Sequence, residues 1–224
     1  MNKPDALSPY NPVDVPNIAL SLALEVLEQD LHPVPPAKTS PGAGIYLIYY
    51  FGEFKPYHAL AVVNSENDCR LPIYVGKGER KGKRKGISFE QSKEAAIHSR
   101  LSNHAKSIQS AENLSLSDFR CRYLAIEEAF IGLAESVLIS VFRPLWNQVV
   151  EGFGNNPTGG PRSSQARSGW DVVHPGRVRG LGKPKKSVAE LTGLITTHLQ
   201  SLDSAGTDEE LARIRDRIQK YELG

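Results

Sequence analysis

Two short apolar stretches, each carrying a tyrosine and a glycine, constrain the fold of this chain more than any other feature. The first covers residues 43–51 and contains Gly-Ile-Tyr at 44–46, and the second covers residues 71–75 and leads into Tyr-Val-Gly at 74–76. Runs of this length that are rich in β-branched and aromatic residues are typical of buried strands. We therefore expect two neighbouring strands of one small sheet, with both phenols at one edge of it.

The following segments predict further elements of the same layer. Residues 89–111 contain little Gly or Pro and predict a helix, residues 119–126 alternate as a strand does, and residues 127–142 form a strongly apolar helical stretch that Pro144 ends. The order strand, strand, helix, strand, helix predicts an α+β fold. Its sheet would have three strands or slightly more, mixed or antiparallel, with helices on its faces. We interpret residues 52–70 as a long connection between the first two strands.

Extensions flank this core on both sides. The first forty residues contain a proline-rich arm and helical spacing at 17–31, residues 151–182 are rich in glycine, and helical patterns return at 187–201 and 208–221. The division is an N-terminal arm and helix at 1–41, a core at 42–150, a glycine-rich tail at 151–182 and C-terminal helices at 183–224.

The charge distribution favours a polyanionic partner for the centre of the chain. Of the net charge of +2, residues 1–40 carry −3 and residues 201–224 carry −2, so the middle carries +7. A basic centre between acidic ends is typical of nucleic-acid binding. A solvated surface with uneven charge is the alternative.

Bulk features indicate a protein of the cytoplasm without a membrane partner. No apolar stretch approaches the ~20 residues that span a bilayer, and the N-terminal segment has no secretory pattern. Cys69 and Cys121 fit no metal or redox spacing, which indicates buried thiols in a reducing compartment.

The core resembles the GIY-YIG nuclease superfamily. The two tripeptides are its signature, with Val in place of the second Ile. Arg100 on the predicted helix, Glu135 in Ala-Glu-Ser-Val-Leu-Ile and Asn147 in Pro-Leu-Trp-Asn follow in the order of that family. The resemblance implies a GIY-YIG core and hydrolysis of DNA phosphodiester bonds.

Within the superfamily the chain looks most like the type II restriction endonucleases. The long spacing between the tripeptides, His104 four residues after Arg100, and the tail at 152–155 and 168–177 resemble enzymes that cut the palindrome CCGCGG. The resemblance implies cleavage of double-stranded DNA, dependence on Mg²⁺ for which Mn²⁺ can substitute, a homodimer on a palindromic site, and a cognate DNA methyltransferase as a biological partner.

The matched positions imply distinct roles in hydrolysis. Glu135 is the expected metal ligand, because a single carboxylate suits Mg²⁺, which keeps waters and takes phosphate oxygens. Arg100 and His104 share a helix face, and Arg100 would bind the scissile phosphate. Tyr46 is the expected general base or proton relay, with its high pKa lowered by a neighbour, and His104 would bind phosphate or take part in the proton transfer.

Two further matched positions are expected to support the site. Tyr74 would position water or phosphate, and Asn147 would brace the site by hydrogen bonds. For each of these side chains the plain alternative is packing on the sheet or exposure on a helix surface.

Basic side chains outside these positions are expected to contact DNA. The loop after the second strand would neutralise phosphates, and the basic side chains of the tail would read base edges. The expected DNA contacts are Lys77, Arg80, Lys81, Lys83, Arg84, Arg162, Arg167, His174 and Arg177.

Two other functions remain open from the sequence. One is a homing or structure-selective nuclease on the same core, which the lack of zinc spacing or an added DNA-binding domain disfavours. The other is a non-catalytic nucleic-acid-binding module, which the filled signature disfavours.

Overall fold

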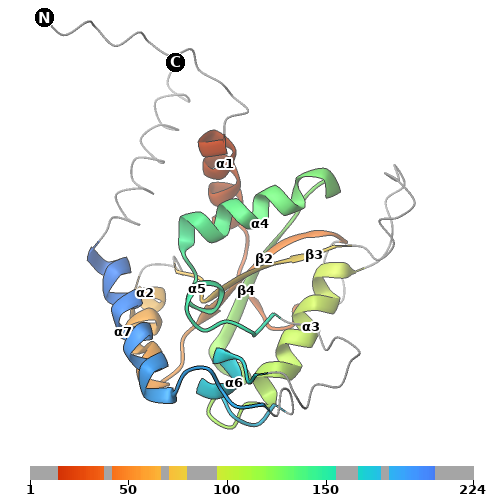
Figure 1. The fold of residues 1–224 in the computed structure, drawn as a ribbon. Helices are drawn as coiled ribbons and strands as arrows, with labels where there is room; N and C mark the ends of the chain where they lie inside the picture. Colours follow the sequence, from red (N-terminus) through yellow and green to blue (C-terminus); the bar gives the residue numbers. More distant parts are fainter. Residues whose placement is uncertain are drawn as a thin grey trace, which may run out of the picture.

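The computed structural model describes residues 15–37, 42–66, 71–79, 95–154, 166–177 and 182–204. Its centre is a four-stranded sheet with helices on both faces (Figure 1). The strands are β1 (His32–Pro33), β2 (Gly44–Tyr50), β3 (Tyr74–Gly78) and β4 (Phe119–Ala125), in the order β1-β4-β2-β3 with every pair antiparallel. The expected α+β class and small sheet are confirmed, and β1 supplies a fourth strand.

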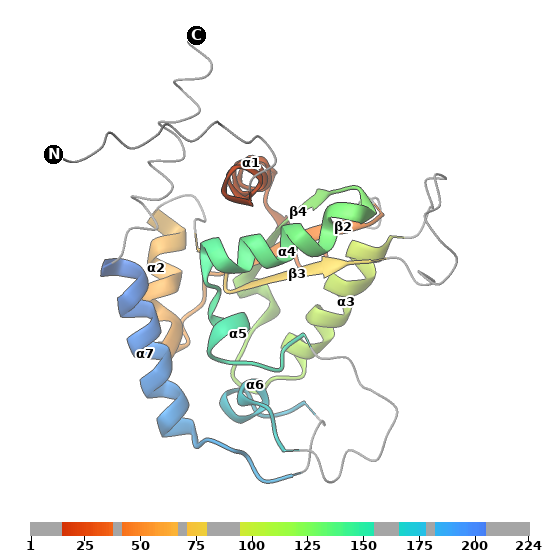
Figure 2. The ribbon, with the colours of Figure 1, turned by 45° about the horizontal axis from the view of Figure 1, so that its top comes forward.

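The central strand β2 divides the core, since all seven of its residues are buried and successive side chains point to opposite faces. Ile45, Leu47 and Tyr49 pack with α1 (Val15–Leu27) and α4 (Glu128–Phe142). Figure 2 shows α4 running along β3. This face therefore forms one apolar layer between the sheet and two helices.

The opposite face of β2 holds the larger cluster. Tyr46, Ile48 and Tyr50 pack there with residues from five helices. These helices are α2 (His58–Glu66), α3 (Ala96–Gln109), α5 (Leu145–Gln148), α6 (Gly169–Val173) and α7 (Val188–Ser204). The part of the glycine-rich tail at 166–177 thus contributes Trp170 and Val173 to the same core as the sheet.

A helix interrupts the segment that the sequence presented as a connection. After the 3₁₀ turn η1 (Lys55–Tyr57), α2 spans His58–Glu66. Its buried face includes the polar Asn64, whose Nδ2 donates to the backbone oxygens of Tyr50 (3.2 Å) and Leu71 (3.0 Å), and whose Oδ1 accepts from the Leu71 N–H (3.0 Å). The prediction of a connection without a helix is therefore wrong. The polar Asn64, which binds the backbone at the end of β2 and just before β3, interrupts the apolar pattern by which so short a helix could be recognised.

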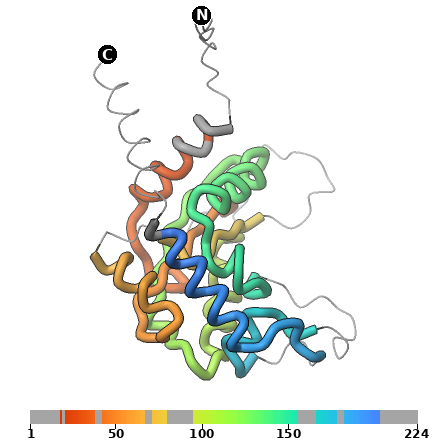
Figure 3. The backbone as a smooth tube through the Cα atoms, turned by 60° about the vertical axis from the view of Figure 1, so that its left-hand side comes forward, coloured from red at the N-terminus to blue at the C-terminus, as the bar shows by residue number. Residues whose placement is uncertain are grey.

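The C-terminal part of the described chain closes the larger cluster. Helix α7 lies against η1 and beside α2 (Figure 3). Its buried residues Leu191 and Ile195 join the core. The second expected helix, at 208–221, and the arm before residue 15 lie outside the described residues. None of the helices in the described part of the chain is long and apolar enough to cross a membrane.

Candidate active site

The two signature tyrosines meet on the α3 face of the sheet. Tyr46 on β2 is opposite Gly76 on β3, and the rings of Tyr46 and Tyr74 are 6.3 Å apart. A side chain at position 76 would overlap the Tyr46 hydroxyl, and its Cβ would lie 2.8 Å from Cε1 of Tyr74. The glycine is therefore required because the Tyr46 ring crosses the strand at that residue.

The Tyr46 hydroxyl lies 2.7 Å from Nε2 of His104 on α3. Tyr46 is fully buried and His104 is 3% exposed. Burial raises the pKa of Tyr46 above its ordinary value of 10.0, with Tyr74 adding to the rise and Arg100 opposing it. Because the phenol keeps its proton, we assign it as the donor and Nε2 as the acceptor of this hydrogen bond. The expected lowering by a nearby cation is present at Arg100, but burial outweighs it, so the pKa of Tyr46 lies above its ordinary value in the protein without substrate.

Arg100 lies one helical turn before His104 and is beside both phenols. Its guanidinium lowers the pKa values of Tyr46 and Tyr74, although burial, the largest influence, raises the pKa of Tyr74 to about 12. Its Nη2 donates to the backbone oxygen of Gly154 at 3.3 Å. A cation close to two neutral phenols is well placed to receive a phosphate.

Glu135 reaches the site from the opposite face, on α4. Its carboxylate lies 3.1 Å from Nζ of Lys77 on β3, and the same Nζ is 3.4 Å from Glu79. Although burial lowers the pKa of Lys77, the hydrogen bond to Glu135 raises it overall. Glu135 in turn raises the pKa values of Tyr46 and Tyr74, so the two faces of the sheet share one electrostatic environment at the edge strand.

Asn147 holds that edge strand from outside. Its Oδ1 accepts from the N–H of Val75, and its Nδ2 donates to the Val75 oxygen, each at 2.9 Å. The neighbouring Trp146 N–H donates to the oxygen of Ile73 at 2.9 Å. The short helix α5 thus occupies the free edge of β3 just beside the Tyr74 side chain.

Residues 152–154, which we call the strap, cover the tyrosine and histidine side chains. The ring of Phe153 stacks on His104 with centroids 4.5 Å apart and an angle of 18°, and it meets Tyr74 edge-on at 5.1 Å. A side chain at Gly154 would overlap the Tyr74 hydroxyl. The strap therefore packs directly on the signature residues. Its Gly-Phe-Gly sequence alone did not indicate this packing role.

The donors of the site fit magnesium better than a metal with a full set of protein ligands. Glu135 supplies one partly exposed carboxylate. No group of three or more His, Cys, Asp or Glu side chains within the described ranges is arranged to hold a metal ion. Mg²⁺ accepts such a site because waters and substrate phosphate complete its shell of oxygen atoms. The nearby Lys77 ammonium shows that the Glu135 side chain already attracts a cation.

His174 is a core residue rather than a DNA contact. It is fully buried, its Nε2 is 2.6 Å from the Tyr57 hydroxyl, and its Nδ1 is 2.9 Å from Oδ1 of Asn113. Burial, aided by Arg177, lowers its pKa to about 3, so the ring is neutral. The prediction that His174 contacts DNA is wrong for this conformation, because both ring nitrogens are engaged inside the protein.

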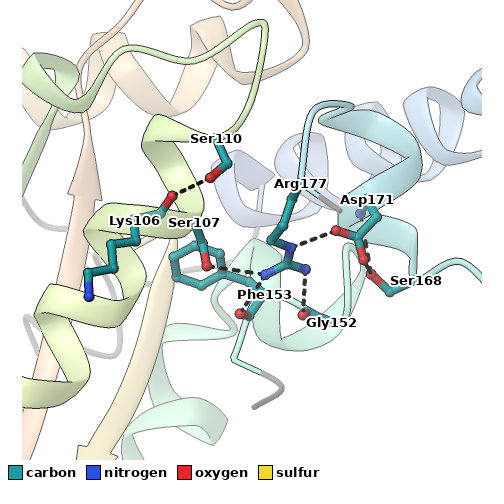
Figure 4. Close-up of polar contacts among 8 residues, drawn as sticks. All are labelled: Lys106, Ser107, Ser110, Gly152, Phe153, Ser168, Asp171 and Arg177. Carbon is teal, nitrogen blue, oxygen red and sulfur yellow. Dashed lines mark hydrogen bonds and ion pairs between the residues drawn. The ribbon is translucent and has the colours of Figure 1, made fainter. Parts of the chain in front are cut away.

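Arg177 is also used internally (Figure 4). Its Nε lies 2.7 Å from Oδ1 of Asp171, its Nη2 donates to the Gly152 oxygen at 3.0 Å, and its side chain is only 5% exposed. The guanidinium lies 4.4 Å from the centre of the Trp170 ring. The prediction that Arg177 reads DNA is wrong for this conformation, because the nitrogens of its guanidinium donate to groups inside the protein.

Arg167, by contrast, is exposed and lines a groove of about 740 Å³ between α7 and the 148–152 segment. Three basic residues that were not among the expected DNA contacts line the same groove: Arg143, Lys185 and Lys186. Gly152 forms part of the wall, so the strap separates this groove from the tyrosines. The other expected DNA contacts, Arg80, Lys81, Lys83, Arg84 and Arg162, lie outside the described residues.

The antiparallel sheet, the paired tyrosines and the Arg, His and Glu side chains around them define a GIY-YIG nuclease domain. Residues 38–220 match the family model described as the Eco29kI GIY-YIG domain. The match covers most of the chain, so the protein belongs to this restriction-enzyme family and carries a restriction-type DNA nuclease domain. No curated protein sequence matches the chain.

Proposed function

We propose that the protein is a Mg²⁺-dependent type II restriction endonuclease that hydrolyses one phosphodiester bond in each strand of a short palindrome. The observation that carries this proposal is the 2.7 Å contact between the Tyr46 hydroxyl and Nε2 of His104, beside Arg100 and within the influence of Glu135. The products would be 5′-phosphate and 3′-hydroxyl ends. Activation of water and stabilisation of phosphate charge are the two requirements of this reaction.

The Tyr46–His104 pair supports proton transfer by relay. A buried phenol whose pKa is raised is a poor phenolate, so Tyr46 is unsuited to act as a base alone. A water proton would pass to the Tyr46 oxygen while the phenolic proton passes to Nε2 of His104. The phenol is regenerated by this exchange, and the imidazole becomes the charged acceptor, which makes His104 the base and Tyr46 its relay.

The remaining residues would hold the phosphate in place. Arg100 would bind a non-bridging oxygen and stabilise the charge that develops in the transition state. Glu135 would hold Mg²⁺, which when bound supplies positive charge to the phosphate and the departing 3′ oxygen. Asn147 would fix β3, and Tyr74 would limit the space open to water.

The groove extends the DNA-binding surface beyond the site. Its Arg143, Arg167, Lys185 and Lys186 side chains would contact phosphates of the flanking duplex. Lys77 touches Glu135, so its part would be close to the scissile bond rather than along the duplex.

The proposed target is CCGCGG, which follows from the likeness of residues 152–155 and 168–177 to enzymes of that specificity. Part of that likeness serves packing, since His174 and Arg177 are buried. A palindrome cut on both strands needs two sites, so the active species would be a homodimer, and a methyltransferase of the same specificity would protect the host DNA.

Plasmid cleavage tests this function. Purified protein with plasmid DNA and Mg²⁺ should give discrete fragments with ends at one palindrome, and Mn²⁺ should also support cleavage. Glu135→Ala should bind the same DNA without cutting it, whereas Glu127→Ala, at the exposed N-cap of the same helix, should cut normally. A smear, cutting restricted to branched DNA, or full activity of Glu135→Ala would contradict the proposal.

A further inference from the structure

Arg177 connects three segments that are distant in sequence (Figure 4). Its Nη1 donates to the Phe153 oxygen at 3.3 Å and to Oγ of Ser107 at 3.4 Å, in addition to the contacts with Gly152 and Asp171. Ser107 belongs to α3, Asp171 to α6, and the other two to the strap. One guanidinium therefore holds the strap against the helix that carries Arg100 and His104.

The other side of the strap contacts those two residues directly. The Gly154 oxygen accepts from Nη2 of Arg100, and the ring of Phe153 lies nearly parallel to that of His104. The orientation of both side chains thus depends on where the strap lies. Moving the strap by a fraction of an ångström would change the Arg100 contact and the plane against which His104 packs.

We propose that Arg177 is a positioning residue that fixes Arg100 and His104 for catalysis by holding residues 152–154. The inference rests on the proposed nuclease function and extends it to a residue that touches neither DNA nor the reacting atoms. Its assignment also accounts for the arginine in a tail that otherwise resembles a DNA-reading segment.

The geometry requires arginine rather than any cation. Nitrogens pointing in three directions satisfy acceptors on three segments at once, and the planar face packs on Trp170. Asp171 is itself oriented, because its Oδ2 accepts from Oγ of Ser168 at 2.6 Å. A lysine would keep the charge near Asp171 but would leave strap oxygens without a donor.

Single-turnover cleavage compared with DNA binding tests the proposal. Arg177→Lys should lower the cleavage rate constant by about 10- to 100-fold, because small misplacements of reacting groups have effects of that size. Its Kd for the target duplex, measured in Ca²⁺, should stay within about threefold of wild type. Arg120→Lys, at an exposed arginine of β4 that lies outside both the site and the groove, is the matched control and should leave the rate constant unchanged.

The amplitude of the cleavage phase separates positioning from folding. A smaller fraction of folded protein would lower the amplitude and leave the rate constant of the remainder intact, whereas misplacement of Arg100 and His104 lowers the rate constant at full amplitude. Phe153→Leu keeps Arg177 but removes the ring on His104, and it should reproduce the slow rate constant at full amplitude.

Three results would overturn the inference. They are a normal rate constant in Arg177→Lys, a decrease confined to amplitude, and weaker binding or altered site choice, which would make Arg177 a DNA-contacting residue. Failure of the wild-type protein to cut any DNA would instead refute the proposed function, so the two failures are distinguishable.

Discussion

At the scale of single residues, the buried contact between Tyr46 and His104 decides how the signature tyrosine can act. A phenol exposed to water titrates near 10, and burial moves Tyr46 further from phenolate. A relay needs no phenolate, since the hydroxyl gains one proton as it gives up another. In the proposed mechanism His104 would therefore be the base, and Tyr46 would relay the proton to it.

Tyr46→Phe should remove the relay while preserving the ring. We expect the single-turnover cleavage rate to fall by about 10²–10⁴-fold, the usual contribution of a positioned proton-transfer group, with little change in DNA affinity. Tyr49→Phe, on the same strand but facing α4, is the control. Rapid cleavage by Tyr46→Phe would exclude the relay.

His174 lies at the centre of a fully directed hydrogen-bond chain. Trp146 Nε1 donates to the Tyr57 hydroxyl at 3.0 Å, and Asn113 Nδ2 donates to the Val173 oxygen at 2.9 Å. The Asn113 oxygen therefore faces His174, so Nδ1 carries the imidazole proton and Nε2 accepts from Tyr57. The neutral ring is built into the core.

This burial makes stability dependent on pH. The pKa of His174 is about 3 in the folded protein and 6.5 in the unfolded chain. Between these two pH values the unfolded chain binds a proton that the folded protein does not bind. The folded state is therefore most stable relative to the unfolded chain above pH 6.5, and this stability is lost as the pH falls toward 3. His174→Phe leaves two buried polar groups without partners and should cost about 2–5 kcal/mol at pH 7.5. The difference in unfolding free energy between wild type and His174→Phe should be about 2 kcal/mol smaller at pH 5 than at pH 7.5.

Urea unfolding of both proteins at the two pH values measures this gap. His58→Phe, at an exposed position of α2, serves as the control and should show a similar gap at both. A gap that widens in acid would mean that His174 is protonated in the folded protein.

At the scale of elements, α5 protects the open edge of the sheet. An edge strand exposes backbone groups that can pair with another chain. The amide of Asn147 imitates a neighbouring strand by satisfying both backbone groups of Val75, and the backbone N–H of Trp146 donates to the Ile73 oxygen. The four-residue helix α5 thus takes the place of a fifth strand next to the signature tyrosines.

Asn147→Ala should leave the Val75 N–H and oxygen without protein partners. We expect a decrease of about 1–3 kcal/mol in unfolding free energy. The rate of hydrogen exchange at the Val75 amide should rise by roughly tenfold or more. Asn103→Ala, at an exposed position of α3, should have neither effect. Unchanged exchange at Val75 would show that the edge is held by other contacts.

The sequence predicted strands β2, β3 and β4 and helices α1, α3, α4 and α7 because their patterns are local, whereas the two-residue strand β1 and helix α2 were not predicted. Tyr46, Arg100, His104 and Glu135 were found through the family motif, and their assigned roles stay predictions. His174 and Arg177 were misinterpreted because a glycine-rich tail resembles a surface loop. Their partners, Tyr57, Asn113 and Ser107, are 61 to 117 positions away for His174 and 70 for Arg177, and no spacing rule connects them.

At the scale of the whole molecule, the candidate active site and the basic groove lie on opposite sides of the strap. A duplex that follows the proposed path would meet Arg100 at the scissile phosphate and the cations of the groove farther along. The groove would then supply affinity that does not depend on sequence, while the tyrosine site supplies chemistry.

Arg143→Ala combined with Lys186→Ala should weaken DNA binding and flatten its dependence on salt. The slope of log K against log salt should become shallower by about 0.9 for each phosphate that the variant no longer neutralises, with the cleavage rate at saturating protein unchanged. Lys55→Ala combined with Arg120→Ala removes two exposed charges outside the groove and should not alter the slope. An equal effect of both pairs would indicate a general charge effect.

The two faces of the short strand β3 contact different groups of site residues. Tyr74 and Gly76 face α3, which carries Arg100 and His104, while Val75 and Lys77 face α4, which carries Glu135. A substitution on one side would therefore act directly on the residues of that side, and on the other side only through the electrostatic influence of Glu135 on the tyrosines. Deleting a single residue within β3 would turn each side chain beyond it to the opposite face. Both groups of side chains would then be misplaced at once, and cleavage would be lost. The length of this strand is therefore as constrained as its amino-acid sequence.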